Sequence, residues 1–410
     1  MVERTGTNYI LLGAIVMNML ITICPFVDLH ANWYITLIPI VVMMFYLQSD
    51  KSSFQSAIRI LCTGLLLVLM QYWLINHRDE FSNVVINGII SWIPCIISLL
   101  CIKLVSTYYQ KYILQIALIA MMVTSITTVQ GIEIFPFASR ELAGAATGEQ
   151  RELYMSMNIG GFEFIYALVI ALPAALWMIS HTKKYLKLLN VFVLLSMIYC
   201  IYASQYTTAL IITIVVLVLI PIYSKPQMRP AIIIGAIFFV FFAGTGIFSA
   251  IIRGISSVIE SDYVADRLQQ VALLLEGQSA QDIDTETSNE RLVLMQQAWD
   301  GFFSSPICGN NWLSWHKNVL SGHSFVLDVL SSSGALGLVI YVYLFYKVFK
   351  KIFVKGFQQM TYYSKIIWIA FIAVTIMNPS AFAIIYLVIF TFAEIINRLD
   401  YIENLNNNGR

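Results

Sequence analysis

Apolar blocks of about 20 residues, separated by short polar connections, are the dominant pattern along the chain. A block of this length matches the hydrocarbon core of a bilayer when it is helical. Reading the chain in such windows predicts twelve spans, near residues 8–28, 33–48, 57–75, 84–104, 112–129, 161–180, 186–203, 207–223, 231–251, 324–346, 364–378 and 381–397. No long stretch alternates apolar and polar positions as a barrel strand does. The pattern therefore predicts an all-α polytopic membrane protein with about twelve transmembrane helices.

Composition agrees with this class. Of the 410 residues, 59% are hydrophobic and 11% are charged, whereas soluble domains have roughly 25% charged residues. The first span lacks the small-residue cleavage pattern of a signal peptide, so we expect it to remain as a helix. The net charge of +1 gives no reason to expect a nucleic-acid partner.

The basic residues predict the orientation in the membrane. If both termini are cytoplasmic, 17 of the 24 basic residues fall on the inner side, which is the bias expected for cytoplasmic loops. The seven that remain outside are Arg78, Arg140, Arg151, Arg253, Arg267, Arg291 and Lys317. We therefore expect a multi-pass protein of the cytoplasmic (inner) membrane.

This topology divides the chain into four segments. Residues 1–251 hold helices one to nine, 252–323 form a large extracytoplasmic loop, 324–398 hold helices ten to twelve, and 399–410 form a cytoplasmic tail. The loop of 72 residues is far longer than ordinary connections, so it should have structure and purpose of its own.

Helical patterns occur inside this loop. Residues 255–275 read as an amphipathic helix, and Thr287-Ser-Asn-Glu290 fits a capping box that would open a second helix. Leu292, Met295, Trp299 and Phe302 would lie on one face of that helix. Ser304-Ser-Pro306 should end it, and Gly309 should turn the chain back toward the membrane.

Several kinds of chemistry are absent from the sequence. There is no Gly-rich phosphate loop, no paired-histidine zinc motif and no serine nucleophile elbow, and no two of the six cysteines have metal-ligand spacing. We therefore expect neither a cofactor nor a metal. An internal repeat and a charge buried at mid-span, both typical of secondary transporters, are missing as well. Polar chemistry gathers instead at the outer surface.

His323 is the leading candidate for chemistry, because it lies where the long loop enters a membrane helix. Histidine is a plausible proton acceptor near neutral pH. Gly334 and Gly337 follow further along the same helix, where they would let another backbone or a bulky ligand come close.

Three motifs together resemble the superfamily of O-antigen ligases and Wzy-type O-antigen polymerases. They are Arg291-Leu, the turn Pro306-Ile-Cys-Gly309, and His323-Ser followed after nine residues by Gly334-x-x-Gly337. The resemblance covers residues 200–350 by motif and the whole chain by helix count and loop placement. One departure is Ser204-Gln-Tyr-Thr-Thr208 before the eighth span, where many members carry an arginine.

The resemblance implies a GT-C-type glycosyltransferase that acts on polyprenyl-pyrophosphate-linked oligosaccharides without a metal. Its partners would include membrane lipids, a chain-length regulator and a flippase. His323 would be the general base that accepts a proton from the attacking hydroxyl. Arginines suit the pyrophosphate leaving group because the guanidinium binds two phosphate oxygens at once.

Arg291 is the first candidate for this pyrophosphate clamp, since it matches the motif directly. Arg253 and Arg267 come next, and Arg140 and Arg151 follow on loop position alone. For each, an ordinary ion pair with a nearby carboxylate is the alternative. The motifs favour a polymerase of O-antigen or capsule-type repeat units. A ligase that transfers the glycan to lipid A core, a protein O-oligosaccharyltransferase and a non-enzymatic flippase or transporter stay open.

Overall fold

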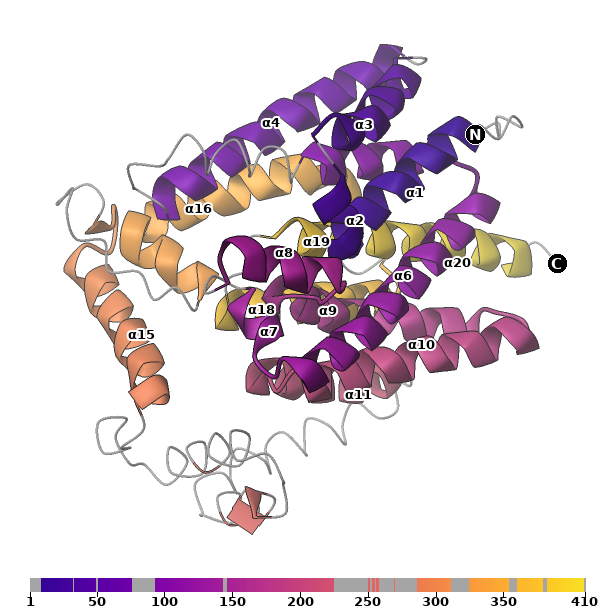
Figure 1. Ribbon diagram of the computed structural model, residues 1–410. Coiled ribbons are helices and arrows are strands. Elements are labelled where there is room, and N and C mark those ends of the chain that lie inside the picture. Colours follow the sequence, from indigo (N-terminus) through magenta and orange to yellow (C-terminus); the bar gives the residue numbers. More distant parts are fainter. Residues whose placement is uncertain are drawn as a thin grey trace. The chain divides into compact units, whose positions relative to one another are not determined.

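The computed structural model describes residues 9–31, 33–48, 51–75, 93–142, 146–224, 286–310, 324–353, 360–378 and 382–408, with a few isolated positions between 250 and 269. All regular structure in these ranges is helical (Figure 1). Four of the described helices are long and apolar enough to cross a membrane: Thr107–Ile134, Phe162–Ser180, Lys184–Ala203 and Phe325–Lys347. The prediction of a helical membrane protein is thereby confirmed.

The chain forms two compact units. The first comprises residues 1–204, 339–374 and 380–410, and the second comprises 205–338 and 375–379. Helices of the first unit are α1 (Tyr9–Ile23), α2 (Pro25–His30), α3 (Trp33–Leu47), α4 (Lys51–Ile75), α6 (Thr107–Ile134), α7 (Ala138–Glu141), α8 (Gly148–Ser156), α9 (Phe162–Ser180), α10 (Lys184–Ala203), α18 (Tyr362–Met377), α19 (Ala383–Leu387), the π-helix η4 (Val388–Phe392) and α20 (Ala393–Asn408). The second unit contains α11 (Thr207–Ser224) and α15 (Glu286–Ser304), α16 (Phe325–Phe353) begins there, and the last residues of α18, from Thr375 onward, belong to it as well.

Helix α9 is the centre of the first unit. Every residue from Phe164 to Ala175 is buried, which is typical of a helix that is apolar on all sides and enclosed by others. It packs against α10 and α19, and α6 packs against α10 and α1. Both ends of α9 are polar, with Glu163 in its first turn and His181 as its C-cap.

Several predicted boundaries are wrong. The span predicted at 8–28 ends at Ile23, because Pro25 lacks an N–H and instead opens the separate helix α2. The span predicted at 112–129 belongs to a longer helix, α6, which continues to Ile134.

The C-terminal region also differs from its prediction. A π-helical turn at Val388–Phe392 lies inside the span predicted at 381–397, and α20 continues through the predicted tail to Asn408. The C-terminal residues up to that position therefore extend the last helix of the bundle.

Helix α15 confirms the second helix predicted in the long loop, including its end at Ser304. It begins at Glu286, so Thr287 lies within the helix and does not cap it. The predicted apolar face is wrong at Trp299, which is 44% exposed, whereas Ala298 is fully buried. Nearly all of the helix predicted at 255–275 lies outside the described residues.

Candidate functional site

Two motifs of the second unit pack directly against each other. The turn after α15 holds Gly309 at a φ of +72°, and α16 holds Gly334 at a φ of +65°. The backbone N–H of Ala335 donates to the carbonyl oxygen of Pro306 at 2.9 Å, and that of Leu336 donates to Ile307 at 3.1 Å. The Pro306–Gly309 turn therefore pairs with α16 at the position where the helix is interrupted.

Both glycines are required by this close approach. A Cβ on Gly309 would lie 2.2 Å from the backbone nitrogen of Ser333, and one on Gly334 would lie 2.3 Å from the carbonyl oxygen of Ile307. Each also has a positive φ, which residues with a Cβ adopt at a cost. The expectation that glycine admits another backbone here is confirmed for Gly334.

The N-terminus of α16 is fixed next to the position of His323. Ser324 is 3% exposed, and its hydroxyl donates to the carbonyl oxygen of Ile376 at 2.6 Å. The hydroxyl oxygen of Ser324 accepts the backbone N–H of Leu327 at 3.2 Å, which is the bond of a helix N-cap. The chain that leaves His323 is thus anchored to the end of α18.

A second candidate site is a pocket of about 260 Å³ in the first unit, at the N-terminal end of α9. Asp28 from α2, Arg151 from α8 and Glu163 from α9 give it polar walls, and Phe164 and Phe382 contribute apolar surface. The Arg151 guanidinium lies close enough to interact electrostatically with both carboxylates. The pocket therefore brings one guanidinium near two carboxyl groups.

Asn158 fixes the wall of this pocket. It adopts a φ of +57°, and its side-chain oxygen accepts the backbone N–H of Phe26 at 3.2 Å. Its amide nitrogen donates to the hydroxyls of Thr124 and Thr127, both at 3.1 Å. One side chain thus joins the start of α2, the C-terminal half of α6 and the turn that leads into α9.

A small apolar cluster supports α7 and α8. Ala138, Leu142, Ala146, Tyr154 and Ile159 are buried together. The Tyr154 hydroxyl donates to Oε2 of Glu141 at 2.5 Å, and Gln150 donates to the same carboxylate oxygen at 2.7 Å. The connection between α6 and α9 is therefore folded, and it holds Arg151 over the pocket.

The structure describes four of the six predicted site residues. Arg151 lines the pocket, and Arg140 is half-buried in α7. Arg253 is exposed on a short helical turn, and Arg291 lies in the first part of α15, its side chain outside the described part. His323 and Arg267 lie outside the described residues altogether.

Asp28, Asn158 and Glu163 were not among the predicted site residues. In the sequence, Glu163 is a carboxylate near one end of the span predicted at 161–180. The other two carry no motif, and a position such as Asn158 becomes recognisable only through the backbone conformation and the partners that the fold gives it.

Asp328 and the serines that follow it form a buried polar stretch in α16. Asp328 is 4% exposed, and Ser331, Ser332 and Ser333 are each at most 3% exposed. The Ser332 hydroxyl donates to the carbonyl oxygen of Asp328 at 2.6 Å. This stretch lies between the position of His323 and Gly334, so polar groups continue from the loop into the helix.

No protein-family model matches this sequence, and no curated protein matches it either. The functional argument therefore depends on the residues and their arrangement.

Proposed function

We propose that this protein is a glycosyltransferase of the cytoplasmic membrane that polymerises polyprenyl-pyrophosphate-linked oligosaccharide repeat units at the outer face. The proposed architecture is GT-C-like, with twelve transmembrane helices and both termini in the cytoplasm. The observation that carries the proposal is the pairing of the Pro306–Gly309 turn with α16 at Gly334. It brings together two of the three motifs on which the family resemblance rests.

The proposed reaction is a displacement at the anomeric carbon of the donor glycan. A hydroxyl oxygen of the acceptor forms the new bond to that carbon while its proton passes to His323. The bond between the anomeric carbon and the pyrophosphate oxygen breaks, and polyprenyl pyrophosphate leaves with the electron pair. Arg291, with Arg253 and Arg267, would stabilise the charge on the leaving group.

The pocket at the N-terminal end of α9 suits a different part of the substrate. Its single arginine already interacts with Asp28 and Glu163, so it is less available to a pyrophosphate. Carboxylates accept hydrogen bonds from hydroxyl groups, and aromatic rings stack on apolar faces. We therefore assign this pocket to hydroxyl groups of the glycan and do not place the phosphates there.

Replacing His323 with alanine tests the proposal. Purified variant and wild-type protein would be supplied with a lipid-linked oligosaccharide, and the lengths of the glycan products would be measured. We expect His323→Ala to insert and fold but to extend glycans roughly 10²–10⁴-fold more slowly, the usual contribution of a general base. His30→Ala, which removes an exposed histidine from α2, is the matched control and should retain extension.

Near-normal extension by well-expressed His323→Ala would contradict the proposed chemistry and favour a flippase, which has no need of a base. The products separate the two enzymatic alternatives. A polymerase leaves the lengthened glycan on polyprenyl pyrophosphate, whereas a ligase transfers it to lipid A core.

A further inference from the structure

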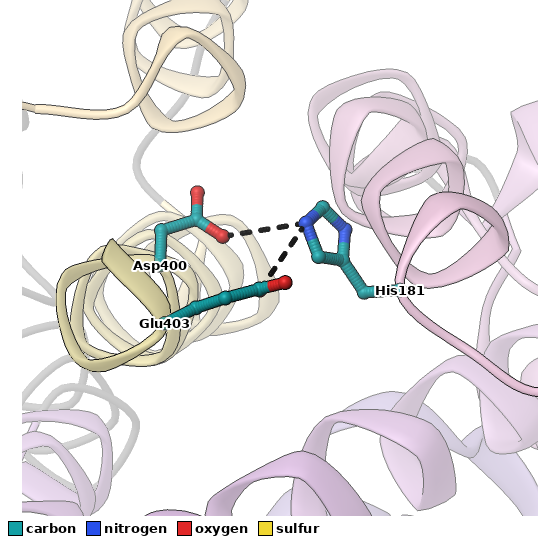
Figure 2. Close-up of side chains that lie close together, drawn as sticks. All are labelled: His181, Asp400 and Glu403. Atoms are coloured by element: carbon teal, nitrogen blue, oxygen red, sulfur yellow. Dashed lines mark ion pairs between the residues drawn. The ribbon is translucent and has the colours of Figure 1, made fainter. Parts of the chain in front are cut away.

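A histidine and two carboxylates converge at the C-terminal end of α9 (Figure 2). Nε2 of His181 lies 3.7 Å from Oδ1 of Asp400 and 3.7 Å from Oε2 of Glu403. One atom from each side chain lies within 4.8 Å of the other two. Asp400 and Glu403 are three residues apart on α20, so they share one face of that helix.

The other ring nitrogen of His181 is already bonded. Nδ1 lies 2.9 Å from the carbonyl oxygen of Trp177, and because a carbonyl only accepts, this nitrogen carries the proton. In neutral His181, Nε2 therefore presents a lone pair toward two carboxylate oxygens. Such an arrangement needs a positive charge between the three atoms.

The surroundings hold the ligand atoms in place. The Trp177 ring stacks on the imidazole with centroids 4.4 Å apart and planes 14° apart. Its indole N–H donates to Oδ1 of Asp400 at 2.6 Å. A backbone carbonyl that orients the imidazole and a donor that orients a carboxylate are the outer contacts that metal ligands usually have.

Lys111 brings a positive charge nearby, which interacts electrostatically with Glu403 and also with the end of α9. Its ammonium donates to the carbonyl oxygen of His181, the C-cap of α9. Carbonyls at a helix C-terminus lack intrahelical donors and attract cations. The hydrogen bond that Lys111 makes is therefore directed at the end of α9.

We propose that His181, Asp400 and Glu403 bind one divalent transition-metal ion, of the Zn²⁺ or Mn²⁺ class. One imidazole with two carboxylates suits these ions better than Ca²⁺ or Mg²⁺, which prefer oxygen ligands alone. The bound ion fastens the C-terminal helix α20 to the end of α9. This site is separate from the pocket that we assign to the glycan, since the 19-residue helix α9 puts about 28 Å between its ends.

Titration of the full-length protein in detergent with Co²⁺, a spectroscopic substitute for Zn²⁺, tests the proposal. After treatment with a chelator, the wild type should bind one equivalent, with visible absorption typical of mixed nitrogen and oxygen ligands. His181→Gln should abolish that absorption, and Glu403→Gln should weaken binding roughly 100-fold or more. His30→Gln and Glu152→Gln remove the same groups from exposed positions and should bind as the wild type does.

Thermal unfolding keeps the proposal testable if a variant folds poorly. Zn²⁺ should raise the melting temperature of the chelated wild type in a saturable way, because an ion that binds only the folded state stabilises it. The melting temperature of His181→Gln should not respond. Absence of saturable binding to the wild type, or equal binding by wild type and His181→Gln, would overturn the proposal and leave a protonated His181 paired with the two carboxylates.

Discussion

Two glycines allow the Pro306–Gly309 turn to pack against α16 in the second unit. Gly309 and Gly334 both have positive φ and both lie against backbone atoms. The sequence predicted the close approach at Gly334 from the glycine spacing alone. It could not predict the partner, because pairing of the turn with α16 depends on how the loop folds.

Gly334→Ala should destabilise the protein. The new Cβ would lie 2.3 Å from the carbonyl oxygen of Ile307, and alanine disfavours a φ of +65°. We expect a loss of about 1–3 kcal/mol from the backbone conformation alone, and more from the clash. The melting temperature in detergent measures this loss of stability. Gly13→Ala is the control, since its Cβ would meet nothing within 4 Å; equal melting temperatures for the two variants would disprove the argument.

Substitution of Arg291 tests whether this residue binds the pyrophosphate. Arg291→Lys should fail almost as badly as Arg291→Ala in glycan extension, because lysine keeps the charge but cannot bind two phosphate oxygens side by side. Rates of extension by the two purified variants provide the comparison. Full activity of Arg291→Lys would reduce Arg291 to a simple field charge or a partner of a nearby carboxylate.

Helices were predictable where an apolar block alone defines them, and less so where polar side chains decide the ends. Residues 33–48, 161–180, 186–203 and 207–223 were predicted within two residues of α3, α9, α10 and α11. The residues between α6 and α9 were predicted only as a loop, yet they form α7 and α8 around a small core. Such short helices are stabilised by tertiary packing, which no local pattern reports.

Asn158 gives the clearest test of this packing. Asn158→Gly tolerates the φ of +57° but removes the side-chain bonds to Phe26, Thr124 and Thr127. Asn158→Ala removes the same bonds and adds a disfavoured conformation. We therefore expect both variants to melt at a lower temperature than the wild type. The free energy of unfolding of the alanine variant should be lower than that of the glycine variant by about 1–2 kcal/mol. Identical melting of all three proteins would show that this side chain does not hold the elements together.

At the scale of the whole molecule, two groups of polar residues lie at opposite ends of α9. On the predicted topology, the pocket with Asp28, Arg151 and Glu163 faces outward and the cluster with His181, Asp400 and Glu403 faces the cytoplasm. The sequence predicted the outer concentration of polar residues. It did not single out the inner cluster, because His181 and the two carboxylates are more than 200 residues apart and meet only when α20 packs beside α9.

The topology of α9 provides the test of this arrangement. Glu152 in α8 and Tyr185 in α10 flank α9, and both are exposed, with Tyr185 at 91%. The 17-to-7 distribution of basic residues predicts that Glu152 lies outside and Tyr185 inside. Each would be replaced by cysteine in a background carrying Cys308→Ser and Cys62→Ser, which removes the two exposed native thiols found among the described residues.

A membrane-impermeant maleimide, added to cells whose outer barrier has been made permeable, should label Glu152→Cys before lysis and Tyr185→Cys only after it. Ser279→Cys in the long loop should behave like Glu152→Cys, because a lipid-linked glycan at the outer face must reach that loop. Labelling in the reverse order would put His323 on the cytoplasmic side, away from the flipped substrate. The proposed glycosyl transfer would then fail, whereas binding of a metal ion by His181, Asp400 and Glu403 would be unaffected, since it depends only on how α9 and α20 pack.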